Sequence, residues 1–125
     1  MNQRPGLYIA HCDGKGRGIF TTTPISEGEI IEICPIIKIP KFEMPIIHKT
    51  HLHDYYFLWG EELDECVIAL GFGSLYNHEL MPNANFILDL DNDTIDIQAI
   101  KDIEAGEEIT LNYNGEPGCE DELWF

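Results

Sequence analysis

Residues 75–86, "LYNHELMPNANF", do not follow the pattern of an ordinary strand or helix. Four polar side chains gather around Pro82, with apolar residues between them: Asn77, His78, Asn83 and Asn85. Amide side chains carry both hydrogen-bond donors and an acceptor, so this density of polar groups needs specific partners. The stretch therefore indicates a special local structure, and the rest of the chain must explain what those partners are.

The length and composition describe a globular chain. At 125 residues with 44% hydrophobic residues, we expect a single domain spanning residues 1–125. The longest apolar stretch, "IIEICPIIKIP", is broken by Glu32, Pro35 and Lys38 and is far shorter than a membrane span. No apolar core of signal-peptide length follows the N-terminus. We expect no membrane association and, by default, a cytoplasmic location.

The cysteine and histidine spacings do not predict a metal site. The four cysteines occur singly, with no C-x-x-C pair, so reduced thiols are expected. The cluster "HKTHLH" offers two or three imidazoles without a second cluster that suggests a fourth ligand. Residues 89–100 begin with calcium-loop spacing, but Thr94 and Ile100 replace the required Gly and Glu. We expect no bound metal.

Negative charge is concentrated in the second half of the chain. The net charge is -16; residues 61–125 contain seventeen acidic residues and one basic residue, Lys101. Such a field repels nucleic-acid phosphates and attracts cationic partners, which argues against direct nucleic-acid binding. Two interpretations stay open: a surface for a Lys/Arg-rich partner, or a solvated face that keeps the protein in solution.

Short strands separated by turns predict a mostly β fold. "GLYIAHC" and "RGIFTTT" flank the turn "DGKG", "YYFLW" and "CVIAL" flank "GEELDE", and "NFILDLDNDTIDIQAI" contains the alternation of a hairpin. "EGEIIEICPIIKI" also reads as a strand, but Pro35 favours an edge strand or a bend over a central strand. Residues 40–53 are expected to form a loop with at most a short helix.

Three ordered segments resemble one family. "GKGRGIF" at 14–20, "GFGSLYNHELMPNANF" at 71–86 and "AIKDIEAGEEITLNY" at 99–113 together resemble the SET-domain protein-lysine methyltransferases. The resemblance covers about residues 6–115, and the compact length is most similar to the small stand-alone viral members. It implies the SET fold: short β-sheets around a knot-like crossing, where the segment after "NH" is threaded by the end of the chain. Pro82 and Asn83 would fix that crossing.

The resemblance also implies a cofactor, S-adenosyl-L-methionine. Matching residue by residue, Gly16, Arg17 and Gly18 would bind its methionine portion, largely through backbone groups, and Asn77 and His78 would complete the site. The chemistry suits this role, because a turn without Cβ atoms lets the backbone approach a ligand closely. Taken alone, "GKGRG" favours a plain hairpin turn over a cofactor site.

Tyr113 matches the family's catalytic tyrosine, and Tyr55, Phe86 and Leu111 match positions that line the substrate-lysine channel. Methyl transfer from a sulfonium to a neutral amine needs alignment in a water-poor site rather than a metal. Aromatic walls suit an apolar stem with a cationic head. By the resemblance, Phe86 and Leu111 favour the addition of more than one methyl.

The sequence departs from the family pattern in two places. "NHEL" stands where "NHSC" is common, so Glu79 places a carboxylate near the expected cofactor site. The three-cysteine zinc motif that often follows the catalytic tyrosine is absent, and residues 116–125 end in Trp124 and Phe125. These two aromatic residues are expected either to cover the site or to anchor the tail to the core.

The resemblance implies methyl transfer to the lysine amine of a basic protein, with histone tails as the leading substrate class and the nucleus as the location if histones are the target. Two acidic patches, Glu61–Glu65 and Glu116–Glu122, suit such a partner. The alternative is a non-catalytic SET-like module that binds a basic protein or the cofactor; a purely acidic decoy is a third interpretation. A homodimer that completes the site is also open.

Overall fold

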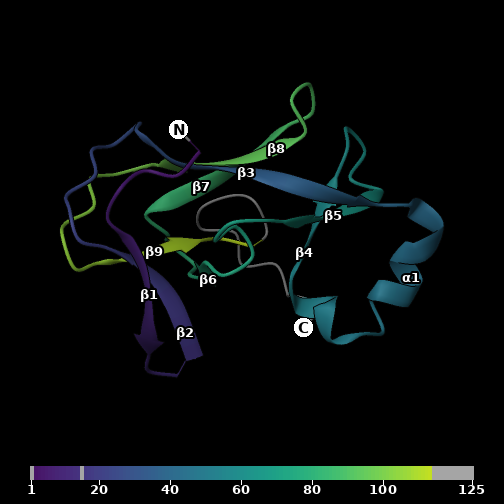
Figure 1. The fold of residues 1–125 in the computed structure, drawn as a ribbon, viewed down its shortest axis with the longest axis horizontal. Helices are drawn as coiled ribbons and strands as arrows, with labels where there is room; N and C mark the ends of the chain where they lie inside the picture. Colours follow the sequence, from purple (N-terminus) through teal and green to yellow (C-terminus); the bar gives the residue numbers. More distant parts are fainter. Residues whose placement is uncertain (1, 15, 114–125) are drawn as a thin grey trace.

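The computed structural model describes residues 2–14 and 16–113, which form two β-sheets (Figure 1). The four-stranded sheet has the order β1 (Leu7–Cys12), β2 (Gly16–Thr21), β9 (Glu108–Leu111), β6 (Asn77–His78). The five-stranded sheet has the order β4 (Tyr56–Trp59), β5 (Glu65–Ala69), β3 (Ile30–Ile39), β8 (Thr94–Ala99), β7 (Ala84–Asp89). The mostly β prediction is confirmed.

Short helical turns connect β3 to β4: η1 (Lys41–Glu43), α1 (Met44–Ile47) and η2 (His51–Asp54). They lie at one end of the molecule, beyond the five-stranded sheet (Figure 1). The expectation of a loop with at most a short helix is confirmed only in part, because three short helical turns cover most of this segment. In the part of the chain that the structure describes, no helix is long and apolar enough to cross a membrane.

The three hairpins predicted from turn residues and alternation are confirmed. β1 pairs with β2, β4 with β5 and β7 with β8, each pair antiparallel. Gly14 (φ 78°) and Asp93 (φ 55°) occupy the left-handed region in two of the turns. Gly and Asp tolerate that conformation better than most residues, which explains why these turns were visible in the sequence.

Pro35 was predicted to favour an edge strand or a bend over a central strand; the edge alternative is wrong, because β3 lies in the middle of the five-stranded sheet. Ile30 to Pro35 pair with β8, whereas Ile36 to Ile39 pair with β5. Pro35 therefore sits where the strand exchanges one partner for the other. The Pro35 carbonyl oxygen accepts a hydrogen bond from the Leu70 N–H (2.8 Å). Proline has no backbone N–H to donate, and Pro35 is the last residue of β3 that pairs with β8.

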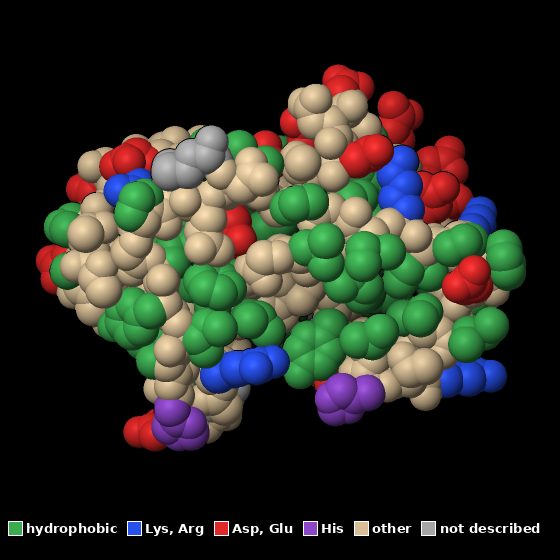
Figure 2. Space-filling view, in the orientation of Figure 1, with side chains coloured by type: hydrophobic (Ala, Val, Ile, Leu, Met, Phe, Trp, Pro, Cys, Tyr) green, Lys and Arg blue, Asp and Glu red, His purple; other side chains and the backbone are tan. Residues whose placement is uncertain are grey.

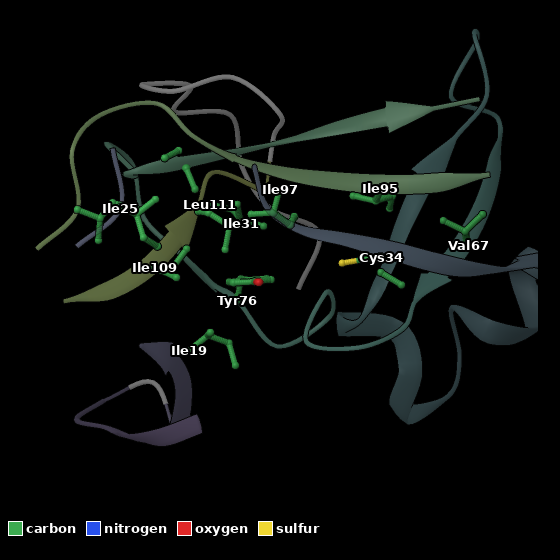
Figure 3. Close-up of a cluster of buried hydrophobic side chains, with 14 of the residues drawn as sticks. Ile19, Ile25, Ile31, Cys34, Val67, Tyr76, Ile95, Ile97, Ile109 and Leu111 are labelled. Carbon is green, nitrogen blue, oxygen red and sulfur yellow. The ribbon is translucent and has the colours of Figure 1, made fainter. Parts of the chain in front are cut away.

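The core fills the space between the two sheets (Figure 3). Ile109 and Leu111 from β9 meet Ile31 from β3 and Ile97 from β8, and all four are fully buried. Tyr76, in the loop before β6, is also buried and points into the same cluster (Figure 3). This core fixes β6 and β9 relative to the larger sheet.

A carboxylate is buried beside this core. Glu32, only 3% exposed, accepts hydrogen bonds from the Tyr76 hydroxyl (2.7 Å), the Phe72 backbone N–H (3.0 Å) and the Gln3 amide (3.0 Å). Burial, followed by the charge of Glu32, raises the pKa of Tyr76. Glu32 thus ties β3 to the loop that leads into β6 and holds the loop in place.

β6 and the segment after it run beside β9, 25 or more residues later in the chain. β6 pairs with β9 in parallel, Asn77 opposite Thr110 and His78 opposite Leu111. Beyond β6, the side chain of Asn83 makes the hydrogen bonds to β9 in place of backbone pairing. Its Nδ2 donates to the Glu108 carbonyl oxygen (2.8 Å), and its Oδ1 accepts from the Thr110 N–H (2.9 Å). Asn83 thus satisfies backbone groups where two segments meet, as expected. The threading by residues beyond 113 lies outside the described residues.

Candidate active site

A cavity of about 440 Å³ opens between the β1–β2 turn, the end of η2, the loop before β6 and the end of β9. The residues that line it come from four separate parts of the chain: Gly16, Arg17, Asp54, Tyr55, Ser74, Leu75, Asn77 and Tyr113. Five of the nine site residues predicted from the family resemblance line this cavity: Gly16, Arg17, Asn77, Tyr55 and Tyr113. The volume falls within the roughly 300–1,000 Å³ of small-molecule sites.

The β1–β2 turn brings bare backbone to the cavity. Gly16 has a positive φ of 78°, and a Cβ at this position would meet no atom within 4 Å. The residue therefore faces open space, and its conformation favours glycine. Arg17 follows in an exposed position of β2. Backbone groups of this turn can approach a ligand without a side chain between them.

Asn77 links this turn to β9. Its Nδ2 donates to the Arg17 carbonyl oxygen (2.9 Å) and to Oε2 of Glu108 (2.7 Å). The predicted cofactor residue Gly18 lies beneath this pair and is buried, so it is not among the residues that line the cavity. A Cβ on Gly18 would come within 2.8 Å of Asn77 Nδ2 and closer still to Glu108 Oε2.

His78 and Tyr113 are adjacent, with ring centroids 5.1 Å apart. The Tyr113 backbone N–H donates to His78 Nδ1 (3.0 Å), and the Tyr113 hydroxyl donates to the Tyr76 carbonyl oxygen (2.6 Å). These bonds orient the phenol at the cavity wall. Burial, and then the charges of Tyr55, Glu108 and Asp54, raises the pKa of Tyr113 to about 12. The phenol therefore stays protonated at neutral pH.

Tyr55 also lines the cavity. It ends η2, where its N–H donates to the Leu52 carbonyl (3.0 Å), and the Ser74 hydroxyl lies 3.1 Å from the Tyr55 carbonyl oxygen. The same hydroxyl lies 3.0 Å from the Ala69 carbonyl oxygen. Ser74 thus connects the Tyr55 backbone to the loop that leads into β6.

The remaining predicted site residues are not among those that line the cavity. Phe86 packs edge-on against Phe57, with centroids 5.2 Å apart, and Leu111 is fully buried in the core. Their roles as channel walls stay predictions, as does the cofactor role of Gly18 and His78. Glu79 is exposed and does not line this cavity; its backbone N–H donates to the Leu111 carbonyl (2.9 Å).

Sequence reasoning missed three lining residues, Asp54, Ser74 and Leu75, and the carboxylate of Glu108 behind Asn77. Asp54 precedes Tyr55 and Glu108 belongs to "GEEITLNY", so both were adjacent to recognised positions without a signal of their own. Among residues 2–14 and 16–113, no group of three or more His, Cys, Asp or Glu side chains could hold a metal ion. Trp124 and Phe125 lie outside the described residues.

Comparison with known proteins matches this geometry. Residues 16–114 match the family model described as the SET domain. The chain is 33% identical over 123 residues to a histone-lysine N-methyltransferase of Schizosaccharomyces pombe, specific for H3 lysine-37, covering 98% of this chain and 78% of the relative. A solved structure from Plasmodium falciparum, described as a candidate histone methyltransferase, superposes with a TM-score of 0.73 at 32% identity, covering 88% of this chain and 94% of the other. The chain belongs to the SET-domain family of protein-lysine methyltransferases.

Proposed function

We propose that this protein transfers a methyl group from S-adenosyl-L-methionine to the side-chain amine of a lysine in a basic protein, with histone tails as the substrate class. One observation carries the proposal. The cavity brings the Gly16–Arg17 turn, Asn77, Tyr55 and Tyr113 together, although these residues are up to 97 positions apart in the sequence. The H3 specificity of the S. pombe relative supports histones as the class to test first.

The chemistry of the lining residues fits the cofactor. Bare backbone at Gly16 and Arg17 offers polar groups at close range, and Asn77 adds a side-chain amide. No lining residue supplies the ligand set of a metal, and methyl transfer needs none. When bound, the cofactor would supply an electrophilic methyl group on its sulfonium sulfur; the lysine nitrogen would form the new C–N bond while the electron pair of the breaking C–S bond would leave with sulfur.

The residues of the chain contribute alignment and exclusion of water. Tyr55 and Tyr113 form apolar walls with polar tips, suited to hold a lysine stem and direct its nitrogen. The amine must lose a proton to solvent before it attacks, and burial favours the neutral amine. Tyr113 keeps its own proton, because its pKa is raised to about 12, so it orients the reacting groups rather than removing a proton.

An acidic surface supports a cationic substrate. Exposed acidic residues occupy the β4–β5 turn, the first position of β5 and the β7–β8 turn: Glu61, Glu62, Asp64, Glu65, Asp91 and Asp93. Figure 2 shows acidic side chains gathered at this end of the molecule. Two lysines neutralise part of the charge: Lys41 pairs with Asp64 (2.8 Å) and Lys38 with Asp93 (3.0 Å). The remaining negative charge would attract a Lys/Arg-rich tail, and this attraction would weaken as the salt concentration rises.

The test is methyl transfer by the full chain from radiolabelled S-adenosyl-L-methionine to core histones, with product mass spectrometry. We expect Tyr113→Phe to lower kcat about a hundredfold while cofactor affinity changes little, because misplacing the reacting groups costs rate rather than binding. The matched control is Tyr8→Phe, an exposed tyrosine on β1, which should retain activity. Cofactor binding without transfer to any histone or other basic protein would overturn the proposal.

A further inference from the structure

We propose that Glu108 is a positioning residue of the methyl-donor site. Its carboxylate holds the side-chain amide of Asn77 in one orientation, so that the amide oxygen Oδ1 can accept hydrogen bonds from N–H groups of the bound methyl donor. The inference rests on the proposed function, because its ligand is the methyl donor. It names a residue that does not line the cavity and acts through one that does.

The orientation of the Asn77 amide follows from its two acceptors. The NH₂ group has two hydrogens, and its nitrogen lies 2.9 Å from the Arg17 carbonyl oxygen and 2.7 Å from Glu108 Oε2. A flipped amide would place its oxygen against both of these oxygens with no hydrogen between them. Within the described part of the chain, Asn77 Oδ1 accepts no hydrogen bond from the protein, and Asn77 lines the cavity. The side chain therefore offers a ligand an acceptor.

Glu108 is itself held from two directions. Its Oε1 accepts from the Cys12 thiol of β1 (3.3 Å), and its Oε2 accepts from Asn77 of β6. The pair lies flat against the backbone of Gly18 in β2, where a Cβ would collide with Glu108 and Asn77. The carboxylate thus sits where β1, β2, β6 and β9 meet. This close approach gives Gly18 a physical requirement for glycine that needs no contact with the ligand.

The donor's chemistry matches an acceptor at this position. Its amino-acid end carries an ammonium and its adenine an exocyclic amine, and both donate hydrogen bonds. Without Glu108, the Asn77 amide could rotate and turn its NH₂ group toward these donors, which would repel them. Loss of the carboxylate should therefore weaken binding of the donor and leave binding of the peptide substrate nearly intact.

The experiment compares Glu108→Ala, Glu108→Gln and Glu107→Ala by calorimetric titration of the full chain with S-adenosylhomocysteine and by steady-state kinetics. Glu108→Ala should weaken donor binding about tenfold, the size expected for a hydrogen bond to a charged group. Glu108→Gln should recover most of the affinity, because its amide oxygen can still accept from Asn77. Glu107 is the matched control: a neighbouring, exposed glutamate outside the cavity lining. The peptide KM should stay within about twofold in each variant.

A compensating pair separates positioning from general destabilisation. Asn77→Asp places a carboxylate against both the Glu108 carboxylate and the Arg17 carbonyl oxygen and should bind the donor poorly. Combining it with Glu108→Gln restores a donor–acceptor pair between positions 77 and 108 and should regain part of that affinity. If Glu108→Ala does not fold, Gly18→Ala is the substitute, because its added Cβ would push the Asn77 and Glu108 side chains apart. It should weaken binding of the methyl donor in the same way. Folded Glu108→Ala with wild-type donor affinity, or Asn77→Asp equally impaired with and without Glu108→Gln, would refute the role of Glu108.

The ligand-free protein gives a readout that does not depend on the proposed function. The Asn77 side-chain NH₂ resonances should shift and exchange faster with solvent in Glu108→Ala than in the wild type. Unchanged Asn77 resonances would refute the inference by themselves. Wild-type protein that binds no S-adenosylhomocysteine, with shifted Asn77 resonances in the variant, would instead overturn the proposed function and the ligand part of the inference while leaving the Asn77–Glu108 bond established.

Discussion

Removing the Asn83 side chain should strongly destabilise the protein, because it deprives two backbone groups of their partners. In Asn83→Ala the Glu108 carbonyl loses a donor at 2.8 Å and the Thr110 N–H loses an acceptor at 2.9 Å. Asn83 is only 6% exposed, so water does not readily replace it. Each unsatisfied buried group costs about 1–3 kcal/mol, which gives about 2–6 kcal/mol in total. A domain of this size is stable by only about 5–15 kcal/mol.

Urea denaturation followed by tryptophan fluorescence measures this loss, with Trp59 buried in the native core. The midpoint should fall by about 1 M or more with little change in slope, since the slope for small domains is about 1–3 kcal/mol per M. Asn85→Ala is the matched control: in the described structure its side chain forms no hydrogen bond, and the change should cost under about 1 kcal/mol. Equal losses in the two variants would refute the reasoning, as would rapid hydrogen exchange of the Thr110 amide in the wild type.

Three further predictions follow from other buried or lining groups. Glu32→Ala should lower the free energy of unfolding, measured by urea denaturation, by about 2–5 kcal/mol, because the Tyr76 hydroxyl and the Phe72 N–H lose their acceptor. Glu32→Gln should lower it less, and equal losses in the two variants would contradict this account. Asp54→Asn should raise the KM of a basic peptide several-fold at low salt, because Asp54 lines the cavity, while donor affinity changes little; an effect confined to the donor would place Asp54 on the cofactor side. The raised pKa of Tyr113 contributes stability that is fully present below pH ~10 and lost as the pH rises through about 12. The free energy of unfolding should therefore fall over that window, and Tyr113→Phe should flatten the fall; an unchanged alkaline profile would argue against burial of the phenol.

Local pattern was sufficient for much of the fold. The three hairpins were visible because a β-hairpin is encoded by neighbouring residues: turn formers that tolerate unusual φ values, flanked by alternating side chains. The same local reasoning failed at Pro35. A proline removes one donor, and the sequence does not show that β3 changes from β8 to β5 at that residue, so that the donor is not needed.

The candidate site was predictable in its members and not in its arrangement. The family resemblance pointed to Gly16, Arg17, Asn77, Tyr55 and Tyr113, and the structure brings all five to one cavity. The neighbours that orient them were not visible. From the sequence alone, a glutamate in "GEEITLNY" is expected to be a solvated charge. Only the structure shows that Glu108 contacts Gly18 and Asn77.

The sequence by itself determined the strands, their turns and the family motifs, because each depends on residues close together in the chain. Tertiary structure alone decided the parallel pairing of β6 with β9, the burial of Glu32 and the contact of Asn77 with Glu108. These features join residues 31 to 44 positions apart, and their stability comes from satisfying buried polar groups, which no local pattern records. The stretch "LYNHELMPNANF" joins both levels: its amides were evident from composition, but their partners on β2 and β9 exist only once the chain has folded.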